Sequence, residues 1–165
     1  MAIRFPIADL RPLGRSARGV TSMKLRTGDT IIGCDIVPQD YDADLLVVTS
    51  DGFGKRTKLS EFRTQNRGGI GLIATKFKST MSRLVALTIV EESDEVMLVT
   101  ANGIVTRLKA NSISQQGRPA TGVRAQNLVD NDSVVSVDKI VNPTKSDDKA
   151  EEVADTESEE TNSEN

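Results

Sequence analysis

Residues 62 to 72 read Phe-Arg-Thr-Gln-Asn-Arg-Gly-Gly-Ile-Gly-Leu, an arginine followed by a glycine-bearing turn. The same pattern occurs three times in the chain. The repeated arginines are 52 and 51 residues apart and the repeated glycines keep both intervals, at Arg15, Arg67 and Arg118 and at Gly19, Gly71 and Gly122. Two markers that recur in one register define a repeat, and a period near 50 residues with β-rich units predicts a propeller-like array.

Short β-rich runs surround each turn, and we expect strands at 31–37, 45–49, 55–59, 84–90, 96–100, 104–108 and 134–140. Asp51-Gly52 and Asn102-Gly103 each lie between two such runs. These dipeptides favour a type I′ hairpin turn because both residues tolerate positive φ. No long segment has helical periodicity. The sequence therefore predicts an all-β, β-propeller-like fold with a partial blade at 2–37 and complete blades at 45–90 and 96–141.

Charge is distributed unevenly along the chain. Nine of the 24 acidic residues fall after Val141, where only Lys145 and Lys149 accompany them, so residues 1–141 carry 19 basic and 15 acidic side chains. Residues 142–165 are rich in Asp, Glu, Ser and Thr and cannot bury enough apolar surface to fold. We expect a mildly basic folded part and a disordered acidic tail.

The single cysteine, Cys34, and the absence of histidine exclude an internal disulfide framework and the usual zinc and haem ligands. In the repeat, Cys34 aligns with Leu87 and Val137, so we interpret it as a small buried hydrophobic residue. The sequence contains neither a signal peptide nor the run of about 18 apolar residues that a membrane span needs. These features predict a soluble cytoplasmic protein.

The repeated arginine turns are candidate phosphate contacts. Glycine lets a backbone approach a ligand, turn amides can bind an anion, and a flanking arginine can bind phosphate through two hydrogen bonds. The alternative is that the glycines close tight turns and the arginines are solvated. Three copies at the edges of successive blades favour binding of bent double-stranded DNA through its backbone. The candidate DNA-binding residues are Arg15, Arg18, Lys55, Arg56, Lys58, Arg63, Gln65, Arg67, Gly68, Gly69, Gly71, Arg107, Arg118 and Arg124; Lys24 and Arg26 add charge beside the first copy.

Catalysis has little support in the sequence. Residues 52–57 lack the spacing of a P-loop, and Asp40, Asp42 and Asp44 lack the glycine and terminal glutamate of a calcium loop. We therefore expect no catalytic residue, metal site or cofactor in this chain. A β-propeller scaffold that binds proteins is the alternative from another functional class.

Several motifs, at 51–57, 61–63, 66–69, 95–100, 117–118 and 121–124, together resemble the C-terminal domain of the DNA gyrase A subunit. They also resemble its paralogue in topoisomerase IV, which stays open as an alternative. The resemblance covers nearly all of residues 2–141. It implies a β-pinwheel, a propeller variant of about six blades that exchange strands.

The resemblance also implies a function. Such a domain wraps double-stranded DNA around a basic rim, while ATP- and magnesium-dependent strand passage in the other parts of the gyrase heterotetramer introduces negative supercoils. Part of the family's signature box is present at Gln65, Arg67, Gly68, Gly69 and Gly71. Its two flanking cations are replaced by Asn66 and Ile70.

Overall fold

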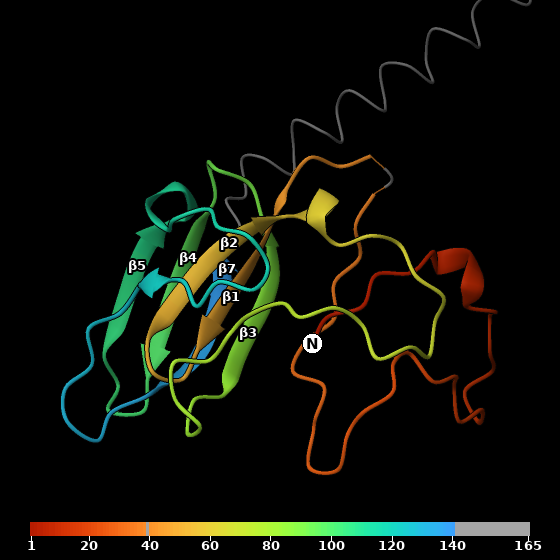
Figure 1. Ribbon diagram of the computed structural model, residues 1–165, viewed down its shortest axis with the longest axis horizontal. Helices are drawn as coiled ribbons and strands as arrows, with labels where there is room; N and C mark the ends of the chain where they lie inside the picture. The colour runs from red at the N-terminus through yellow and green to blue at the C-terminus, as the bar shows by residue number, and fades with distance from the viewer. Residues whose placement is uncertain (39, 141–165) are drawn as a thin grey trace, which may run out of the picture.

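The computed structural model describes residues 1–38 and 40–140 of the chain. These residues form seven strands and three short 3₁₀ helices, which confirms the all-β class. None of the described helices is long and apolar enough to cross a membrane. The predicted acidic tail and Val141 lie outside the described residues. In Figure 1 the strands gather on one side of the molecule, and the N-terminal part, in red and orange, extends as loops on the other.

The first sheet has four strands in the order β3-β1-β2-β6. β1 (Asp44–Thr49) lies between β2 (Phe53–Lys58) and β3 (Leu84–Val90), and both pairs are antiparallel. The fourth strand, β6 (Val123–Arg124), comes from much later in the chain and pairs with β2. We call residues 44–90 unit two.

The second sheet has three strands in the order β5-β4-β7. β4 (Glu95–Thr100) pairs antiparallel with β5 (Val105–Lys109) and with β7 (Val134–Ile140). We call residues 95–140 unit three and residues 2–37 unit one. The predicted strands of units two and three are confirmed to within a few residues, because their alternating Val, Leu and Ile side chains suit a half-buried sheet.

Two apolar clusters form the core. One joins the facing sheets through side chains such as Leu46, Val90, Leu98 and Val134, each at most 1% exposed. The other packs the opposite face of the first sheet against Leu59, Phe62 and Ala74, among others. A fully buried Val or Leu side chain contributes roughly 1.5–3 kcal/mol relative to its exposed state. The clusters therefore hold the sheets rigidly enough to position the loops between them.

The sequence repeat is also a repeat of backbone conformation. The three 3₁₀ helices, η1 (Ile7–Asp9), η2 (Leu59–Glu61) and η3 (Ala110–Ser112), follow one another at intervals of 52 and 51 residues. The three repeated glycines all adopt the left-handed conformation, with φ of 79°, 79° and 96° at Gly19, Gly71 and Gly122. Unit one therefore shares local geometry with the other units although it contains no named strand.

Neighbouring units exchange backbone pairing. Residues 64–72 of unit two bridge to unit one at the pairs Arg4–Thr64 and Ala2–Leu72. Residues 115–123 of unit three bridge to unit two at the equivalent pairs, Arg56–Gln115 and Gly54–Val123. We call each such segment a strap. Each strap covers the edge of the preceding unit, which agrees with the strand exchange that the resemblance implies.

The expected strand at 31–37 is absent, and Cys34 is exposed rather than buried. Its equivalents Leu87 and Val137 lie in strands that pair with the opening strand of their own unit. No opening strand of unit one lies among the described residues. Without a strand to pair with, residues 31–37 remain an extended loop, and the prediction of a buried cysteine is wrong for this structure.

The hairpin turns differ from the predicted type I′ geometry. Gly52 and Gly103 have positive φ, but outside glycine positive φ occurs among the described residues only at Asp40 and Asn131. The amide of Gly52 donates to the carbonyl of Thr49 at 3.0 Å, and that of Gly103 to Thr100 at 2.9 Å. These features define a three-residue loop, a type I turn followed by a left-handed glycine.

Candidate nucleic-acid interface

The repeated arginines sit on three equivalent loops, at 14–18, 66–70 and 117–121. Each of the two later loops lies along the segment that follows the previous loop. The amide of Lys24 donates to the carbonyl of Gly69 at 2.8 Å, and the amide of Lys76 donates to that of Ala120 at 3.3 Å. The loops and the segments 21–26 and 73–78 thus form one continuous surface across the units, which we call the rim.

Two of the repeated arginines form hydrogen bonds that connect neighbouring segments of the rim. Nη1 of Arg67 donates to the carbonyl of Thr21 at 2.5 Å, and Nη1 of Arg118 donates to the equivalent carbonyl, that of Ile73, at 3.2 Å. Both arginines are half-buried, whereas Arg15 is exposed. Because a guanidinium has five N–H donors, Arg67 and Arg118 combine a structural contact with donors that remain for a ligand.

The glycines of the motif serve packing between units. A Cβ atom on Gly71 would lie 2.4 Å from the carbonyl oxygen of Ala2, so only glycine lets the strap approach unit one this closely. The amide of Gly68 donates to Ser22 at 2.8 Å. The prediction that the turn amides bind an anion is therefore wrong for Gly68, and Gly71 is required by a protein contact.

Gln65 and Gly69 also take part in contacts between units. The backbone amide of Gln65 donates to Arg4 at 2.8 Å, and the Gly69 carbonyl accepts the Lys24 amide. Two side-chain nitrogens of the box, Nε2 of Gln65 and Nε of Arg67, are buried without a hydrogen-bond partner in the described residues. The box is thus chiefly a junction between units one and two.

Lys55 and Arg56 are buried, at 0% and 5% exposed, because the strap of unit three covers β2. Nζ of Lys55 donates to the carbonyls of Gly117 and Arg118 at 2.7 and 2.5 Å. Burial lowers the pKa of Lys55 to about 8, against the attraction of Glu61 and with the repulsion of Arg118. The prediction that Lys55 and Arg56 contact DNA is corrected, since neither can meet a phosphate at the surface.

Arg56 and Arg107 occupy the same position of the repeat and bind equivalent acids. Nη1 of Arg56 lies 2.6 Å from Asp44, and both side chains are 6% exposed. Arg107 pairs with Glu95, but its side chain is 61% exposed, because β5 is an edge strand among the described residues. The main contact of Arg107 in this structure is therefore its ion pair with Glu95 of β4.

The other candidate cations, Arg18, Arg63, Lys58 and Arg124, are exposed. Lys58 lies 3.3 Å from Asp42 in a solvent-exposed ion pair, which is worth little energetically. Arg124 lies opposite Phe53 in the β2–β6 ladder, with its guanidinium carbon 5.2 Å from the centre of the ring.

The structure adds rim cations that the candidate set lacks. Lys24 and Lys76 are separated by 52 residues, as are Arg26 and Lys78, and all four are exposed on the segments that follow the loops. This interval equals that between Arg15 and Arg67, so the sequence repeat already indicated that these cations occupy equivalent positions. The structure adds that their segments lie beside the next arginine loop and therefore belong to the rim.

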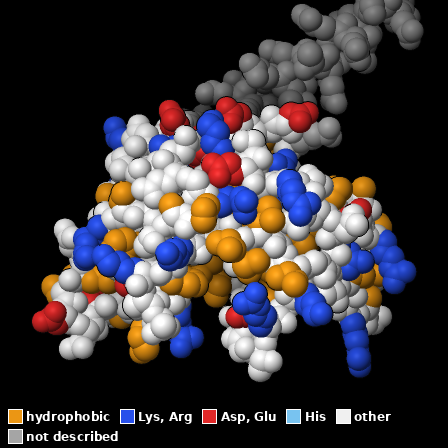
Figure 2. Space-filling view, in the orientation of Figure 1, with side chains coloured by type: hydrophobic (Ala, Val, Ile, Leu, Met, Phe, Trp, Pro, Cys, Tyr) orange, Lys and Arg blue, Asp and Glu red, His pale blue; other side chains and the backbone are white. Residues whose placement is uncertain are grey.

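Acidic side chains collect where the first strand of a unit begins. Asp42 precedes β1, Glu91 and Glu92 follow β3, Asp94 precedes β4, and Glu95 begins β4. In Figure 2, Lys and Arg side chains spread over the lower part and sides of the face, and most visible acidic side chains lie at its upper edge. Because phosphate is anionic, this acidic end is an unfavourable place for DNA.

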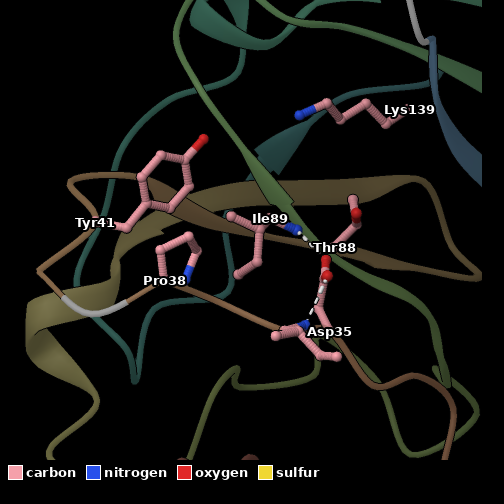
Figure 3. A pocket seen from close by; sticks show the side chains of 7 residues that line it. Asp35, Pro38, Tyr41, Thr88, Ile89 and Lys139 are labelled. Atoms are coloured by element: carbon pink, nitrogen blue, oxygen red, sulfur yellow. Dashed lines mark hydrogen bonds between the residues drawn. The ribbon is translucent and has the colours of Figure 1, made fainter. Parts of the chain in front are cut away.

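A hollow of about 320 Å³ lies near the acidic end, lined by Asp35, Ile36, Pro38, Tyr41, Thr88, Ile89 and Lys139 (Figure 3). Its charged side chains already have partners. Asp35 accepts the amides of Ile36 and Ile89 at 2.9 and 3.0 Å, and Lys139 lies 2.7 Å from Asp94. Asp35 and Lys139 therefore serve as structural contacts of this hollow.

Tyr41, in the same hollow, donates its hydroxyl hydrogen to Glu91. This hydrogen bond, helped by burial and by the charges of Glu91 and Asp94, raises the pKa of Tyr41 to about 12. A tyrosine held in its neutral form by a carboxylate is a weak nucleophile.

Comparison with known proteins agrees with this architecture. A family model described as DNA gyrase C-terminal domain, beta-propeller, matches residues 1–38, 43–91 and 94–140, which correspond to the three units. The DNA gyrase A subunit of Staphylococcus epidermidis is 43% identical over 138 residues, which cover 84% of this chain and 16% of that protein. The equivalent protein of Synechocystis is 39% identical over 183 residues, covering 92% and 21% respectively.

Two solved structures have a similar fold. The C-terminal domain of DNA topoisomerase IV aligns with a TM-score of 0.77 at 26% identity, over 82% of this chain and 42% of that one. A DNA gyrase A C-terminal domain aligns with a TM-score of 0.70 at 33% identity, over 81% and 45%. The fold is therefore that of the C-terminal β-propeller domains of DNA gyrase A and topoisomerase IV. Within that class of domains, the chain belongs to the DNA gyrase C-terminal domain family.

Proposed function

We propose that this chain binds and bends double-stranded DNA along the rim, as a non-catalytic part of the DNA gyrase A subunit. The observation that carries the proposal is the continuity of the rim. Three equivalent loops and the cationic segments between them adjoin one another from unit one through unit two to unit three. A duplex that follows the rim would meet a cation in every unit.

The proposed contacts are electrostatic and independent of base sequence. Lys and Arg neutralise phosphates and release counterions, and DNA bent over successive units gains further contacts of the same kind. The proposed contacts are Arg15, Arg18, Lys24, Arg26, Arg63, Arg67, Lys76, Lys78, Arg118 and Arg124, with Lys58 and Arg107 at lower weight because of their acidic partners.

The chain spans only about 16% of the length of the Staphylococcus relative. We propose that its partners are the remainder of the gyrase A subunit and the gyrase B subunit. Those parts would supply the nucleophile, ATP hydrolysis and magnesium, and the wrapped DNA would direct strand passage toward negative supercoils. We propose that the protein performs this DNA wrapping in the cytoplasm, in association with the nucleoid.

The test measures affinity of the full chain for a linear duplex long enough to bend, as salt rises from about 50 to 200 mM. Six or more phosphate contacts predict a loss of roughly 10³-fold. The double variant K24Q/K76Q should lower the slope of log K against log salt by about 1.8. The control K109Q removes an exposed cation near the acidic end that is not among the proposed contacts. It should change the slope by clearly less than the 0.9 expected of each single rim variant.

Bending is followed by energy transfer between dyes at the two duplex ends, which should approach one another on binding. A loss confined to particular DNA sequences, or binding that ignores salt, would contradict the proposal. The second result would instead point to a protein-binding scaffold.

A further inference from the structure

The ring of Phe53 contacts two cations that come from different units. Nζ of Lys78 lies 4.7 Å from the ring centre, and the guanidinium carbon of Arg124 lies 5.2 Å from it. Both distances are within the range of cation–π attraction. Phe53 begins β2, Lys78 lies in the loop before β3, and Arg124 is the residue directly after the strap of unit three, so the three side chains meet at the seam between units two and three.

The backbone fixes this arrangement. Phe53 and Arg124 are directly opposite in the antiparallel β2–β6 ladder, which places their side chains on one face of the sheet. The loop that carries Lys78 is anchored to unit three by the hydrogen bond from the amide of Lys76 to the carbonyl of Ala120. Both cations are therefore brought to the ring by the same strap that joins the units.

The acid whose charge acts on Lys78 already has hydrogen-bond partners. Asp51 accepts hydrogen bonds from the hydroxyls of Thr49 and Ser82 at 2.5 and 2.7 Å. Although burial opposes ionisation, these bonds and, more weakly, the charge of Lys78 lower the pKa of Asp51, so the carboxylate stays charged. Neither Lys78 nor Arg124 forms an ion pair with an acid of the described residues, and both are exposed. Their N–H groups remain free for an anionic ligand.

The cluster is unique within the repeat. Lys78 has a cationic equivalent in Arg26. The positions equivalent to Phe53 hold Met1 and Ile104, which have no aromatic ring. The positions equivalent to Arg124 hold Thr21 and Ile73, which carry no charge. The seam between units two and three therefore differs from the rest of the rim in holding two cations on one aromatic ring. At the same seam Arg118 lies over a second ring, that of Phe62, with its guanidinium carbon 5.9 Å from the ring centre.

We propose that Lys78 and Arg124 form a composite phosphate-binding subsite for the DNA backbone, with Phe53 as the residue that positions both cations. The subsite rests on the proposed function and specifies the part of the rim that contributes most to DNA affinity. Arg124 offers a planar fork for two phosphate oxygens and Lys78 a compact charge. Holding two long side chains on a ring before binding reduces the entropy that they lose when DNA binds.

The experiment is a double-mutant cycle in the full chain, with duplex affinity and its salt slope as readouts. K78Q and R124Q should each lower the slope by about 0.9. F53L keeps every charge and should weaken binding by about 3- to 10-fold. F53Y keeps the aromatic ring and should bind the duplex as tightly as wild type. In the F53L background K78Q should cost clearly less than in wild type.

F5L is the matched control, because Phe5 is half-buried like Phe53, lies outside the rim, and no cation contacts its ring among the described residues. Its affinity should equal that of wild type. F53L within about twofold of wild type, or F53L and K78Q effects that simply multiply, would overturn the subsite. If wild-type binding itself ignored salt, the proposed function would fail, whereas salt-dependent binding without coupling would remove the subsite alone.

Discussion

Nζ of Lys55 in unit two lies 2.5 Å from the carbonyl oxygen of Arg118 in unit three. A lysine that its sequence context assigns to DNA is therefore a clamp between two repeats. The same nitrogen also donates to the carbonyl of Gly117, so one ammonium group binds two neighbouring carbonyls of the strap. Charge in the repeat thus has two uses, joining units and lining the rim.

Replacing Lys55 by methionine should destabilise the fold. The variant K55M keeps most of the side-chain volume but removes the lysine donor from both strap carbonyls, of which that of Gly117 keeps only the Ala120 amide, at a cost of about 2 kcal/mol. Urea unfolding measures this cost. Because Lys55 is buried, the salt slope of DNA binding should stay as in wild type.

The control for that variant is K58M, which removes an exposed lysine three residues away. Its stability should lie within about 0.5 kcal/mol of wild type. Equal stabilities of K55M and K58M would show that the clamp contributes nothing.

Stability should rise as pH increases from 8 toward 10. The pKa of Lys55 is about 8 in the folded chain against an ordinary 10.5, so the unfolded state binds more protons in this window. The free energy of unfolding then rises with pH by up to about 1.4 kcal/mol per pH unit. Unfolding curves recorded at several pH values should show the rise in wild type, and its persistence in K55M would assign it to another group.

The repeated glycines should respond differently to alanine. Gly19 and Gly122 both have positive φ, which costs alanine roughly 1–2 kcal/mol at either site. A Cβ on Gly122 would also lie 2.4 Å from the carbonyl oxygen of Gly54, whereas nothing described lies within 4 Å at Gly19. Thermal unfolding should therefore show a clearly larger loss for G122A, and similar losses would argue against tight docking of the strap.

The equivalent ion pairs Arg56–Asp44 and Arg107–Glu95 should contribute unequally to the free energy of unfolding. D44N removes the carboxylate that lies 2.6 Å from the buried guanidinium of Arg56 and leaves it only the exposed Glu92 at 3.9 Å, which should cost about 3 kcal/mol. E95Q breaks the exposed pair with Arg107 and should cost less than about 1 kcal/mol. Chemical denaturation of the two variants tests this; a costly E95Q would mean that the edge of β5 is covered in solution.

Most of the fold can be predicted from local pattern. The strands 84–90 and 134–140 begin and end where the hydrophobic runs do, because alternation and turn residues are local properties. The run at 31–37 has a similar composition yet forms no strand, since a strand needs a partner and no opening strand of unit one is described. The hairpin turns lie where the sequence predicts them but have a different type, because Asp51 and Asn102 keep negative φ.

For the candidate interface, the sequence by itself determined the repeat, its register and the positions of the cations. Only the tertiary structure decided which cations face solvent. Arg56 and Arg107 share a register position and an equivalent acidic partner, yet their side chains are 6% and 61% exposed. The physical reason is the strap, which covers the edge of β2 but has no counterpart on β5 among the described residues. Burial depends on what another unit places over a residue, and that is not encoded near the residue itself.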